Sequence, residues 1–562
     1  MKWKIIPFEE SSRELVRHLE VHPLLGQLLL NRGVEDSREA KRFLFPTLND
    51  LTNPFRMKGV EEGVRRVIKA VLKGEKITIY GDYDVDGMTS VALLKGFLSE
   101  LGVSAEHYIP KRLEEGYGLN PEAIKFIASK GTKLLITVDC GISNRDEIAL
   151  AQSLGMDTIV LDHHEPPEIL PPGIIIDPLQ RDCPFPFKGL AAVGVTFLFL
   201  MALRKMLREE GFFSHRSQPN LKRYLDLVAL GTVADVVPVV EENRIFLKFG
   251  FEELQKTPRP GLRALKDLSG LGDADINYEH VAFRLAPRLN AGGRMQKEEV
   301  PLRLLLSEDE EEAQELAQEL EEANRQRQLT QERIYAEARQ RAHELRDKPA
   351  IVLASENWHP GVIGIVASKI AEEFYRPTIL IALDGSEGRG SGRGIPEVHM
   401  KELLEHCRDL LVSFGGHKSA AGLKVKREHL EAFERSFLKA VEEAFGGKTP
   451  LPSLLIDLAL SLKDITLPLV DSLELLAPFG PGNPNPVFCS NEPVNIESLR
   501  RFERDVTRFS VVGRGRRYEA VAFGPFPDPP PKAMIAFVPK KEFCEGYLRL
   551  TLEIKGLKES KS

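Results

Sequence analysis

The chain has 562 residues, 42% of them hydrophobic and 28% charged, so it is long enough for several domains with buried cores. Its formal net charge of −7 excludes a protein that is basic overall, and any nucleic-acid-binding surface must therefore be local. The five cysteines contain no CxxC pair, which argues against a disulfide framework or a zinc ribbon and favours a reducing cytoplasm.

The first segment, residues 1–50, shows short helical patterns and begins without the apolar stretch of a secretory signal. From residue 51 to about 240, short β-rich apolar runs such as KITIY and KLLITV alternate with amphipathic helical segments. This alternation is typical of βαβ units, so we expect an α/β domain with a parallel sheet over residues 51–306. The apolar stretch 190–203 is too short to span a bilayer and predicts a buried helix.

Residues 307–347 are rich in Glu, Gln, Ala and Arg and contain no Gly or Pro. This composition predicts a long connecting helix, polar on nearly all sides, that bridges two domains through solvent. A coiled-coil stalk is the alternative, but no a/d seam is sustained. Farther along, strand-like runs flanking a helical segment predict a smaller α/β domain over residues 348–447. Short alternating runs over residues 448–562 predict a small β-barrel.

Three aspartates, Asp82, Asp84 and Asp86, follow the apolar run ITIY on alternate positions of the stretch GDYDVDG. An EF-hand calcium loop is excluded because the twelfth position from Asp82 is Leu93 and the preceding flank is typical of a strand. A solvated turn is the simplest alternative. The other alternative is half of a metal site, which requires further acids or histidines at the ends of other apolar runs.

Such residues do follow three more runs: Asp139 in LLITVDCG, Asp162–His163–His164 in DTIVLDHH, and Asp235 in LVALGTVADVVP. We expect these runs to be strands whose carboxyl ends meet at one edge of a doubly wound sheet, where ligands bind. One aspartate at a strand end is usually a cap or a turn, and one histidine pair is usually hydrogen-bonded structure. Four segments that converge on one edge instead predict a metal site.

The ligand types indicate which metal this site would bind. Carboxylates with one imidazole suit Mn²⁺ or Mg²⁺ better than zinc, which favours thiolates and more imidazoles. So many carboxylates repel one another unless two divalent ions neutralise them, and two ions about 3.5–4 Å apart are a common device for phosphoester hydrolysis. We therefore expect two divalent ions as cofactors.

The motifs GDYDVDG, VDCG, LDHH and GTVADVVP resemble those of the DHH phosphoesterase superfamily, and FGGHKSAAG (414–422) resembles its DHH-associated substrate-binding domain. Further motifs narrow the resemblance to the RecJ family of bacterial single-strand-specific DNA exonucleases: KRLEEGYGL (111–119), PRLNAGGR (287–294), HPGVIGIVASK (359–369), GRGSGRG (388–394) and PFGPGNPNPVF (478–488). The resemblance covers nearly the whole chain apart from residues 1–50 and the detail of the final barrel, which itself looks like an OB-fold.

This resemblance implies an enzyme that hydrolyses single-stranded DNA from 5′ to 3′ and releases 5′-mononucleotides in recombination and repair. The implied partners are a helicase and a single-strand-binding protein, and we expect a cytoplasmic monomer without a membrane segment. Two α/β domains joined by a helix would face each other across a cleft, which we expect to admit one DNA strand and to exclude a duplex.

The resemblance also implies the metal ligands. One ion would be bound by Asp84 and Asp139, and the other by four residues, namely Asp86, Asp139, His163 and Asp235. Asp139 would then bridge both ions, and His164 would donate to a non-bridging oxygen of the scissile phosphate. Asp82 is either a further ligand or a residue that orients one, because Tyr80 stands where many relatives have a histidine.

Candidate DNA contacts come from the glycine-rich motifs. In GRGSGRG, exposed backbone N–H groups with Arg389, Ser391 and Arg393 would form a phosphate nest, although such a stretch taken alone is more often a flexible turn. The resemblance favours contacts from Ser391 and Arg393, and likewise from His417 in GGH rather than a plain glycine hinge. The remaining candidates are Arg112, Tyr117, Arg288 and Arg294. Tyr117 would stack on a base, its alternative being ordinary packing.

The last domain concentrates Arg514, Arg516 and Arg517 near aromatic residues, which indicates either a single-strand platform or a solvated basic hairpin. Two other functions fit the DHH motifs. One is a phosphatase for small substrates, such as pyrophosphate or dinucleotides, but such proteins generally lack the third domain. The other is a non-catalytic scaffold, which the filled ligand positions disfavour.

Overall fold

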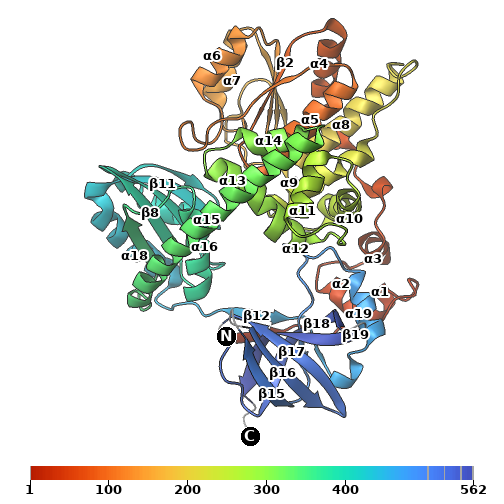
Figure 1. Cartoon of the computed structure of the whole chain (residues 1–562), viewed down its shortest axis with the longest axis vertical. Helices are drawn as coiled ribbons and strands as arrows, with labels where there is room; N and C mark the ends of the chain where they lie inside the picture. The colour runs from red at the N-terminus through yellow and green to blue at the C-terminus, as the bar shows by residue number, and fades with distance from the viewer. Residues whose placement is uncertain (1, 503–505, 525, 545–546, 560–562) are drawn as a thin grey trace.

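The computed structural model describes residues 2–502, 506–524, 526–544 and 547–559. An α/β domain, a smaller α/β domain and a β-barrel are arranged as three bodies (Figure 1). The long helix α15 (Glu310–Glu344) joins the first body to the second. Among the described residues, none of the helices has both the length and the apolar character needed to cross a membrane.

The α/β domain is built on the predicted parallel sheet, whose strand order is β3-β2-β4-β5-β6. These strands are Ile77–Gly81 (β2), Glu106–Tyr108 (β3), Leu134–Val138 (β4), Asp157–Leu161 (β5) and Ile174–Ile176 (β6). They are apolar runs because helices cover both faces of the sheet. One face is covered by Val60–Lys73 (α4), Val85–Glu100 (α5) and Ala192–Glu209 (α8), and the other by Pro121–Ser129 (α6) and Arg145–Ser153 (α7).

The apolar stretch 190–203 forms the predicted buried helix, since it lies in α8. The expectation that Asp235 follows a strand is wrong, because the preceding run forms the helix α9 (Leu225–Ala234). This helix packs against α5, α8 and α10 (Glu241–Gln255) and is buried nearly all round. A helix that is apolar on every side has no 3.6-residue pattern that would separate it from a buried strand.

The connecting helix α15 is present as predicted, but it does not simply bridge the domains through solvent. A stripe that includes Leu316, Leu320 and Ile334 is buried along it. The stripe packs against α16 (Ile363–Phe374) of the smaller domain and three helices of the first domain, namely Pro260–Leu268 (α11), Ala286–Arg294 (α13) and Glu299–Leu306 (α14). Small alanines in the stripe hide its apolar character in the sequence, because they allow close packing without a strong hydrophobic pattern.

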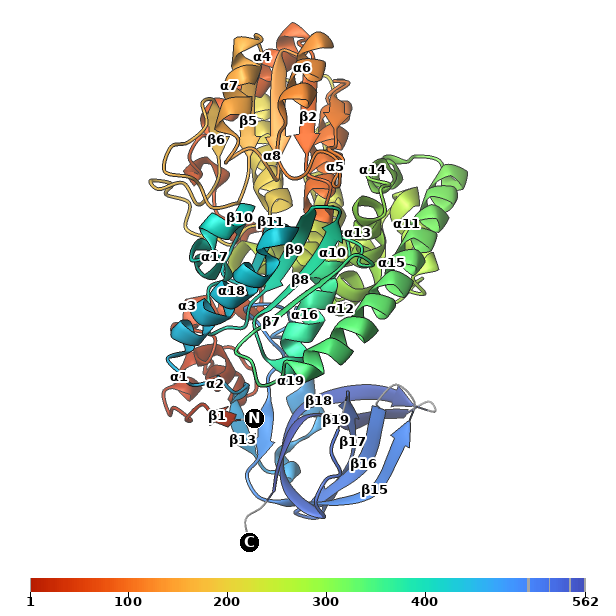
Figure 2. The ribbon, with the colours of Figure 1, turned by 90° about the vertical axis from the view of Figure 1, so that its left-hand side faces the viewer.

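The smaller α/β domain has a five-stranded sheet of order β10-β11-β9-β8-β7 (Figure 2). The strands are Ile351–Ser355 (β7), Thr378–Asp384 (β8), Glu387–Arg393 (β9), Leu411–Gly416 (β10) and Ala420–Lys426 (β11). The motif GRGSGRG therefore lies largely in β9. Because β9 pairs with β8 on one side and β11 on the other, its backbone N–H groups belong to the sheet. The predicted phosphate nest in this stretch is therefore wrong.

The C-terminal domain is the predicted barrel. Its ring is closed by the strands Val494–Phe502 (β15), Val506–Gly513 (β16), Arg516–Phe523 (β17), Lys532–Cys544 (β18) and Tyr547–Glu559 (β19), with β18 pairing with both β15 and β19. The N-terminal segment packs on it: Lys2–Ile5 (β1) pairs with Ser453–Ile456 (β12), and Leu24–Leu30 (α2) and Ser37–Leu44 (α3) share its core. The two ends of the chain thus form one body.

Candidate metal centre and nucleic-acid interface

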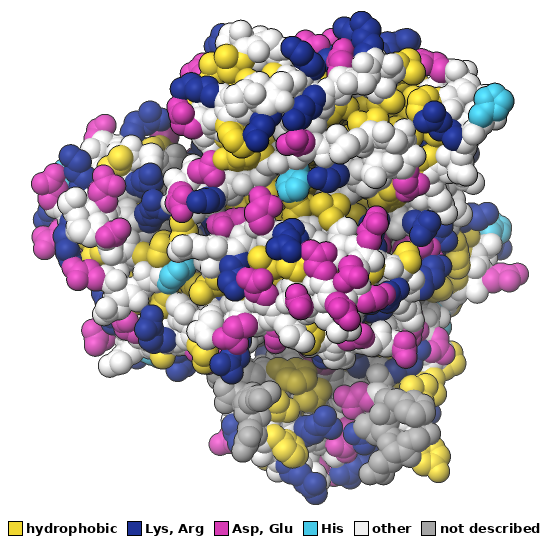
Figure 3. Space-filling view, turned by 45° about the horizontal axis from the view of Figure 1, so that its top comes forward, with side chains coloured by type: hydrophobic (Ala, Val, Ile, Leu, Met, Phe, Trp, Pro, Cys, Tyr) yellow, Lys and Arg dark blue, Asp and Glu magenta, His cyan; other side chains and the backbone are white. Residues whose placement is uncertain are grey.

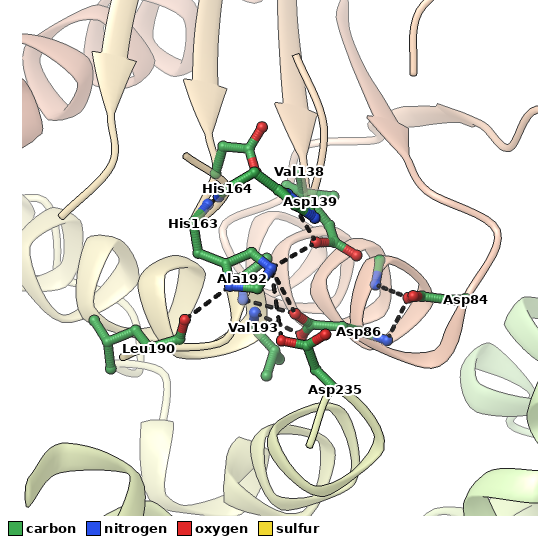
Figure 4. A network of polar contacts seen from close by, with 12 residues as sticks. Asp84, Asp86, Val138, Asp139, His163, His164, Leu190, Ala192, Val193 and Asp235 are labelled. Atoms are coloured by element: carbon green, nitrogen blue, oxygen red, sulfur yellow. Dashed lines mark hydrogen bonds and ion pairs between the residues drawn. The ribbon is translucent and has the colours of Figure 1, made fainter. Parts of the chain in front are cut away.

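The carboxyl ends of the parallel strands bring the predicted acids to one edge of the sheet. Asp82 follows β2, Asp139 follows β4, and Asp162 and His163 follow β5. Asp235 reaches the same place as the residue that ends α9. Figure 4 shows the His163 ring between Asp139, Asp86 and Asp235, with Asp84 facing them.

The grouping of these side chains fits the binding of divalent ions. Three sets have ligand atoms within 4.8 Å of one another: Asp82, Asp84 and Asp139; Asp86, His163 and Asp235; and Asp139, His163 and His164. Two of these sets share Asp139, and two share His163. In addition, Nε2 of His163 and Oδ1 of Asp82 are buried without a hydrogen-bond partner among the described residues. Buried polar atoms are normally paired, so these two atoms fit the role of metal ligands.

Asp86 is held by a distant part of the chain. Its two carboxylate oxygens accept hydrogen bonds from the backbone N–H groups of Ala192 (2.7 Å) and Val193 (2.9 Å), at the start of α8. The first N–H groups of a helix have no partner within the helix, and they favour a negative charge. Asp84 acts similarly at the start of α5, where it accepts from the N–H groups of Asp86 and Gly87.

The ring of His163 has the tautomer that a metal ligand needs. Its Nδ1 donates to the carbonyl of Leu190 at 2.9 Å, which leaves the Nε2 lone pair facing the aspartates. The distance from Nε2 to the nearest oxygen of Asp139 is 3.2 Å, and to that of Asp235 it is 3.6 Å. Burial, followed by the neighbouring charge of His164, lowers the pKa of His163 to about 4, so the ring is neutral at pH 7.

Asp162 organises the site without facing the other acids. It is fully buried and accepts hydrogen bonds from the backbone N–H of Ile142 (3.0 Å), from that of His163 (2.8 Å) and from Nδ1 of His164 (2.8 Å). Sequence reasoning did not give this residue a role of its own, although the stretch LDHH contains it. Its carboxylate fixes the position of both histidines.

Asp139 has an unusual backbone conformation, with φ of 61°. Non-glycine residues seldom adopt this left-handed geometry, and those that do are concentrated at functional sites. The conformation is held from both sides, since the N–H of Asp139 donates to Leu161 and its carbonyl accepts from the Tyr117 hydroxyl at 3.2 Å.

The acids repel one another strongly in the absence of a cation. The pKa values of Asp82, Asp139 and Asp235 are raised well above the ordinary value of an aspartate. Burial is the main cause, and the negative charges of neighbouring aspartates raise these pKa values further. Burial, followed by the charge of Asp84, raises the pKa of Asp86 to about 7. A bound divalent ion removes this repulsion, which is the physical reason for so many acids in one buried site.

His164 joins the metal centre to the smaller domain. Burial disfavours its charged form, but the hydrogen bond and charge of Asp162 outweigh burial and raise the pKa of His164 to about 9. The Tyr117 ring lies edge-on to it, with centroids 5.5 Å apart. On the other side, the ring of His417 from the β10–β11 hairpin stacks on it at a centroid distance of 6.2 Å.

Four arginines interact electrostatically, and we call them the arginine cluster: Arg112, Arg294, Arg327 and Arg393. Two of them also interact with the acids, Arg112 with Asp82 and Arg294 with Asp84. Burial is the main cause that lowers the pKa of Arg294 to about 9, and the charges of the other three add to it. They come from both α/β domains and from α15. Three of them were predicted as DNA contacts. Arg327 was missed, because a single arginine in a Gln- and Arg-rich helix carries no signal in the sequence.

The motif HPGVIGIVASK shapes this cluster. The carbonyl of Gly361 accepts a hydrogen bond from Arg294 at 2.9 Å. The guanidinium of Arg393 donates to the hydroxyls of Ser368 (3.1 Å) and Ser391 (3.0 Å). A Cβ on Gly364 would lie 3.0 Å from Arg393, so glycine leaves the space that this side chain occupies.

The other two predicted arginines, Arg288 and Arg389, are bound by groups of the protein itself. Arg288 binds Glu321 through an ion pair and donates to the carbonyl of Arg284, so its charge is already matched within the helices. Arg389 donates to the carbonyl of Leu113 at 3.0 Å and so ties the smaller domain to the loop that contains Arg112 and Tyr117.

The barrel arginines are partly paired: Arg514 with Glu492, and Arg517 with Glu497. Arg516 lies with Arg549 and Tyr518 along one shallow pocket. On the face of the molecule shown in Figure 3, Lys and Arg side chains are interspersed with Asp and Glu.

Three family models match the chain. They are the DHH family, N-terminal domain, over residues 76–232, the DHHA1 domain over residues 347–447, and the RecJ OB domain over residues 456–556.

Curated relatives cover most of the chain. "Single-stranded-DNA-specific exonuclease RecJ" of Escherichia coli (strain K12) is 37% identical over 519 residues, which cover 90% of this chain and 89% of that protein. The protein of the same name from Bacillus subtilis (strain 168) is 38% identical over 519 residues, and there the match spans 92% of this chain but 64% of the longer relative.

Solved structures share this fold. The crystal structure of RecJ in complex with Mn²⁺ from Thermus thermophilus has a TM-score of 0.86 at 31% identity and covers 100% of this chain and 80% of that one. The corresponding Mg²⁺ complex has a TM-score of 0.80 at 29% identity.

Proposed function

Because the chain belongs to the RecJ family of single-stranded-DNA-specific exonucleases, we propose that it removes 5′-mononucleotides from the 5′ end of single-stranded DNA by two-metal hydrolysis. The observation that carries the proposal is a buried acidic centre that faces an arginine cluster contributed by both α/β domains. The acidic centre would bind metal cations, and the arginine cluster would bind the phosphates of a nucleic acid.

The residues of the acidic centre divide into two sets of ligands. One ion would be held by Asp84 and Asp139, with Asp82 as a further ligand because it groups with both. The other would be held by four residues, namely Asp86, Asp139, His163 and Asp235. Mn²⁺ or Mg²⁺ bound there supplies the Lewis acidity that phosphodiester hydrolysis requires.

His164 has the charge and position to bind the scissile phosphate. Its Nδ1 donates to Asp162, and when the ring is doubly protonated its Nε2–H would donate to a non-bridging phosphate oxygen. Despite the effect of burial, the hydrogen bond and charge of Asp162 raise the pKa of His164, which favours the cationic ring and so a stronger hydrogen bond to the phosphate. Stacking with His417 would bring the smaller domain against the same phosphate.

The arginine cluster accounts for the direction of digestion. A terminal 5′-phosphate carries more negative charge than an internal phosphodiester, and it would be bound by Arg112, Arg294 and Arg393 with Ser391. Arg112 interacts electrostatically with Asp82, and Arg294 with Asp84, so the first phosphodiester bond would lie near the ions. Tyr117 would stack on the base of the terminal nucleotide.

The cleft between the two α/β domains supports selection of single strands. Arg294 and Arg389 make hydrogen bonds across it, to Gly361 and the loop at Leu113. Such bonds limit its width, so we propose that it excludes a duplex. We further propose a monomer in the cytoplasm that acts in recombination and repair on strands supplied by a helicase or bound by a single-strand-binding protein.

The test is digestion of single-stranded oligonucleotides labelled at either end, with Mn²⁺. Wild-type protein should release labelled mononucleotide at once from the 5′ label and spare blunt duplex, whereas Asp139→Ala should release none. Asp146→Ala, an exposed acid on α7, serves as the control and should behave as wild type. Hydrolysis of pyrophosphate or a dinucleotide with intact DNA would support the small-substrate function. No hydrolysis with any metal would support the scaffold.

A further inference from the structure

The motif PFGPGNPNPVF has a place in the structure that the proposed reaction does not explain. It lies mostly in residues 475–487, which connect Leu467–Glu474 (α19) to Phe488–Ser490 (β14), and we call this part the 475–487 segment. At its centre, the N–H of Gly480 donates to the carbonyl of Asn483 (2.9 Å), and the reverse bond measures 3.1 Å. The intervening Pro–Gly pair, with φ of 74° at glycine, makes a tight turn.

This turn touches the loop that follows the metal ligand Asp235. The carbonyl of Pro481 accepts a hydrogen bond from the N–H of Val239 at 2.6 Å. A Cβ on Gly480 would lie 2.6 Å from a methyl group of Val239, so only glycine allows this approach. Within the loop, Val236 has φ of 60°, a conformation that surrounding contacts must maintain in a β-branched residue.

Arg244 of α10 fastens the 475–487 segment to the α/β domain. Its side chain is buried, and the guanidinium donates to the carbonyls of Leu475 (3.1 Å), Leu476 (2.8 Å) and Phe43 (2.8 Å). It also lies 4.1 Å from the centroid of the Phe43 ring. A buried cation needs all its donors satisfied, so these carbonyls and the arginine fix one another's positions.

Asn483 stabilises the segment by hydrogen bonds to its own backbone. It is fully buried, and its Nδ2 donates to the carbonyls of Leu476 and Pro478, both at 2.8 Å. Its Oδ1 accepts from Nε of Arg32 on the N-terminal side at 2.7 Å. The N-terminal segment, the barrel and the α/β domain therefore meet at this one group of polar contacts.

Asn243, next to Arg244, connects these contacts to the loops beside the metal ligands. It is buried, and its Nδ2 donates to the carbonyls of Pro238 (3.0 Å) and Gly189 (2.6 Å). Pro238 belongs to the loop after Asp235. Gly189 precedes the residue whose carbonyl fixes the tautomer of His163. One amide thus joins the two loops that direct two ligands of the same ion.

We propose that Asn243, Arg244 and Asn483 are positioning residues for the metal ligands Asp235 and His163. Docking of the 475–487 segment on α10 holds both loops in place, so binding of the ion between Asp86, His163 and Asp235 depends on the C-terminal domain. This inference rests on the proposed function for its two ions, and it assigns the motif PFGPGNPNPVF to the metal centre rather than to DNA.

The test measures Mn²⁺ binding to the full chain by titration calorimetry, beside the melting temperature, for Arg244→Met and Asn483→Leu. We expect one of two Mn²⁺ ions to bind about 10–100-fold more weakly, as when a group that supports a ligand is lost, with the other unchanged. The rate of DNA digestion should fall at low Mn²⁺ concentration and recover at high concentration.

The matched control is Arg66→Met. The Arg66 side chain is also largely buried, and it pairs with Asp157 and Glu75 at the amino ends of the strands, on the opposite edge of the sheet. This variant should lower the melting temperature and leave both Mn²⁺ affinities unchanged. If Arg244→Met and Asn483→Leu behave in the same way, Arg244 and Asn483 are structural only, docking of the 475–487 segment does not position the ligands, and the inference is overturned.

Two milder variants keep the test decisive if those proteins do not fold. Arg244→Lys keeps the charge with fewer donors, and Gly482→Ala strains the turn at its positive φ. Wild-type Mn²⁺ affinity in both would also overturn the inference. If the wild-type chain itself binds no Mn²⁺, the proposed function fails first, which distinguishes the two failures.

Discussion

The two surfaces that meet at the site hold their polar groups in opposite ways. In the α/β domain, Asp86 and Asp162 are fully buried and held by backbone N–H groups. In the smaller domain, Arg393 and Ser391 are partly exposed and held by side-chain hydroxyls and neighbouring groups. In the proposed function, the groups at the metal centre must keep their geometry before substrate arrives, whereas the phosphate contacts can adjust as it binds.

This contrast predicts different kinetic consequences for the two surfaces. Substitutions among the buried acids should lower kcat and metal affinity. Substitutions in the arginine cluster or at Tyr117 should mainly raise KM, because they remove contacts that the bound nucleotide makes before and during the reaction.

The largest effect is expected for Asp139→Ala. Loss of the ligand that we propose both ions share should lower kcat on 5′-labelled single-stranded DNA by about 10³-fold or more, since metal stabilisation contributes several kcal/mol. In metal-free buffer its melting temperature should match or exceed that of wild type, because a repelling carboxylate is gone. Digestion near the wild-type rate in Mn²⁺ would remove Asp139 from the centre of the mechanism.

Arg393→Ala should have the next largest effect. A charged hydrogen bond is worth about 1.5–3 kcal/mol, so KM for 5′-phosphorylated DNA should rise roughly 10–100-fold with a smaller change for 5′-hydroxyl DNA. Arg408→Ala, an exposed arginine of the same domain paired with Glu405, is the control. Equal losses on both kinds of end would show that Arg393 does not read the terminal phosphate.

Tyr117 separates stacking from hydrogen bonding. Stacking of an aromatic ring on a base contributes about 1–3 kcal/mol, so Tyr117→Leu should raise KM about tenfold or more, whereas Tyr117→Phe should stay near wild type. If the phenylalanine variant loses as much as leucine, the hydroxyl's bond to the Asp139 carbonyl is what matters. Steady-state kinetics on an oligonucleotide decides between them.

The smallest effect is expected for Asp177. This buried acid follows β6, at the same edge of the sheet as the metal centre, but it does not belong to the sets of ligand atoms described above. Burial, as the main cause, raises the pKa of Asp177 to about 8. The unfolded chain releases this proton near pH 4, so the folded chain holds more protons between pH 4 and 8 and loses stability as pH rises.

Asp177→Asn should remove this loss. Between pH 5 and 8, the free energy of unfolding of wild type should fall relative to the variant by more than about 1 kcal/mol, since one pKa unit corresponds to about 1.4 kcal/mol. Urea titrations at several pH values provide the measurement, with Asp146→Asn as the exposed control and kcat expected to remain unchanged. Parallel curves for wild type and Asp177→Asn would contradict the assignment.

The sequence by itself determined the α/β framework and most of the acidic centre. Apolar runs that alternate with helical segments are typical of a parallel sheet with covered faces, and such a sheet brings its carboxyl ends to one edge. Asp82, Asp139 and His163 follow those runs directly, so their convergence follows from local pattern alone. The closed barrel and the long helix were also predictable from period and composition.

The tertiary structure alone decided the rest. It placed Asp235 at the end of a helix, because a segment buried on every side has no period to reveal its form. It brought the start of α8 to Asp86 across 106 residues of chain, and Arg327 to the arginine cluster. It also turned GRGSGRG into a paired strand. These features depend on contacts between distant segments, and no local sequence pattern encodes which distant backbone group a side chain will meet.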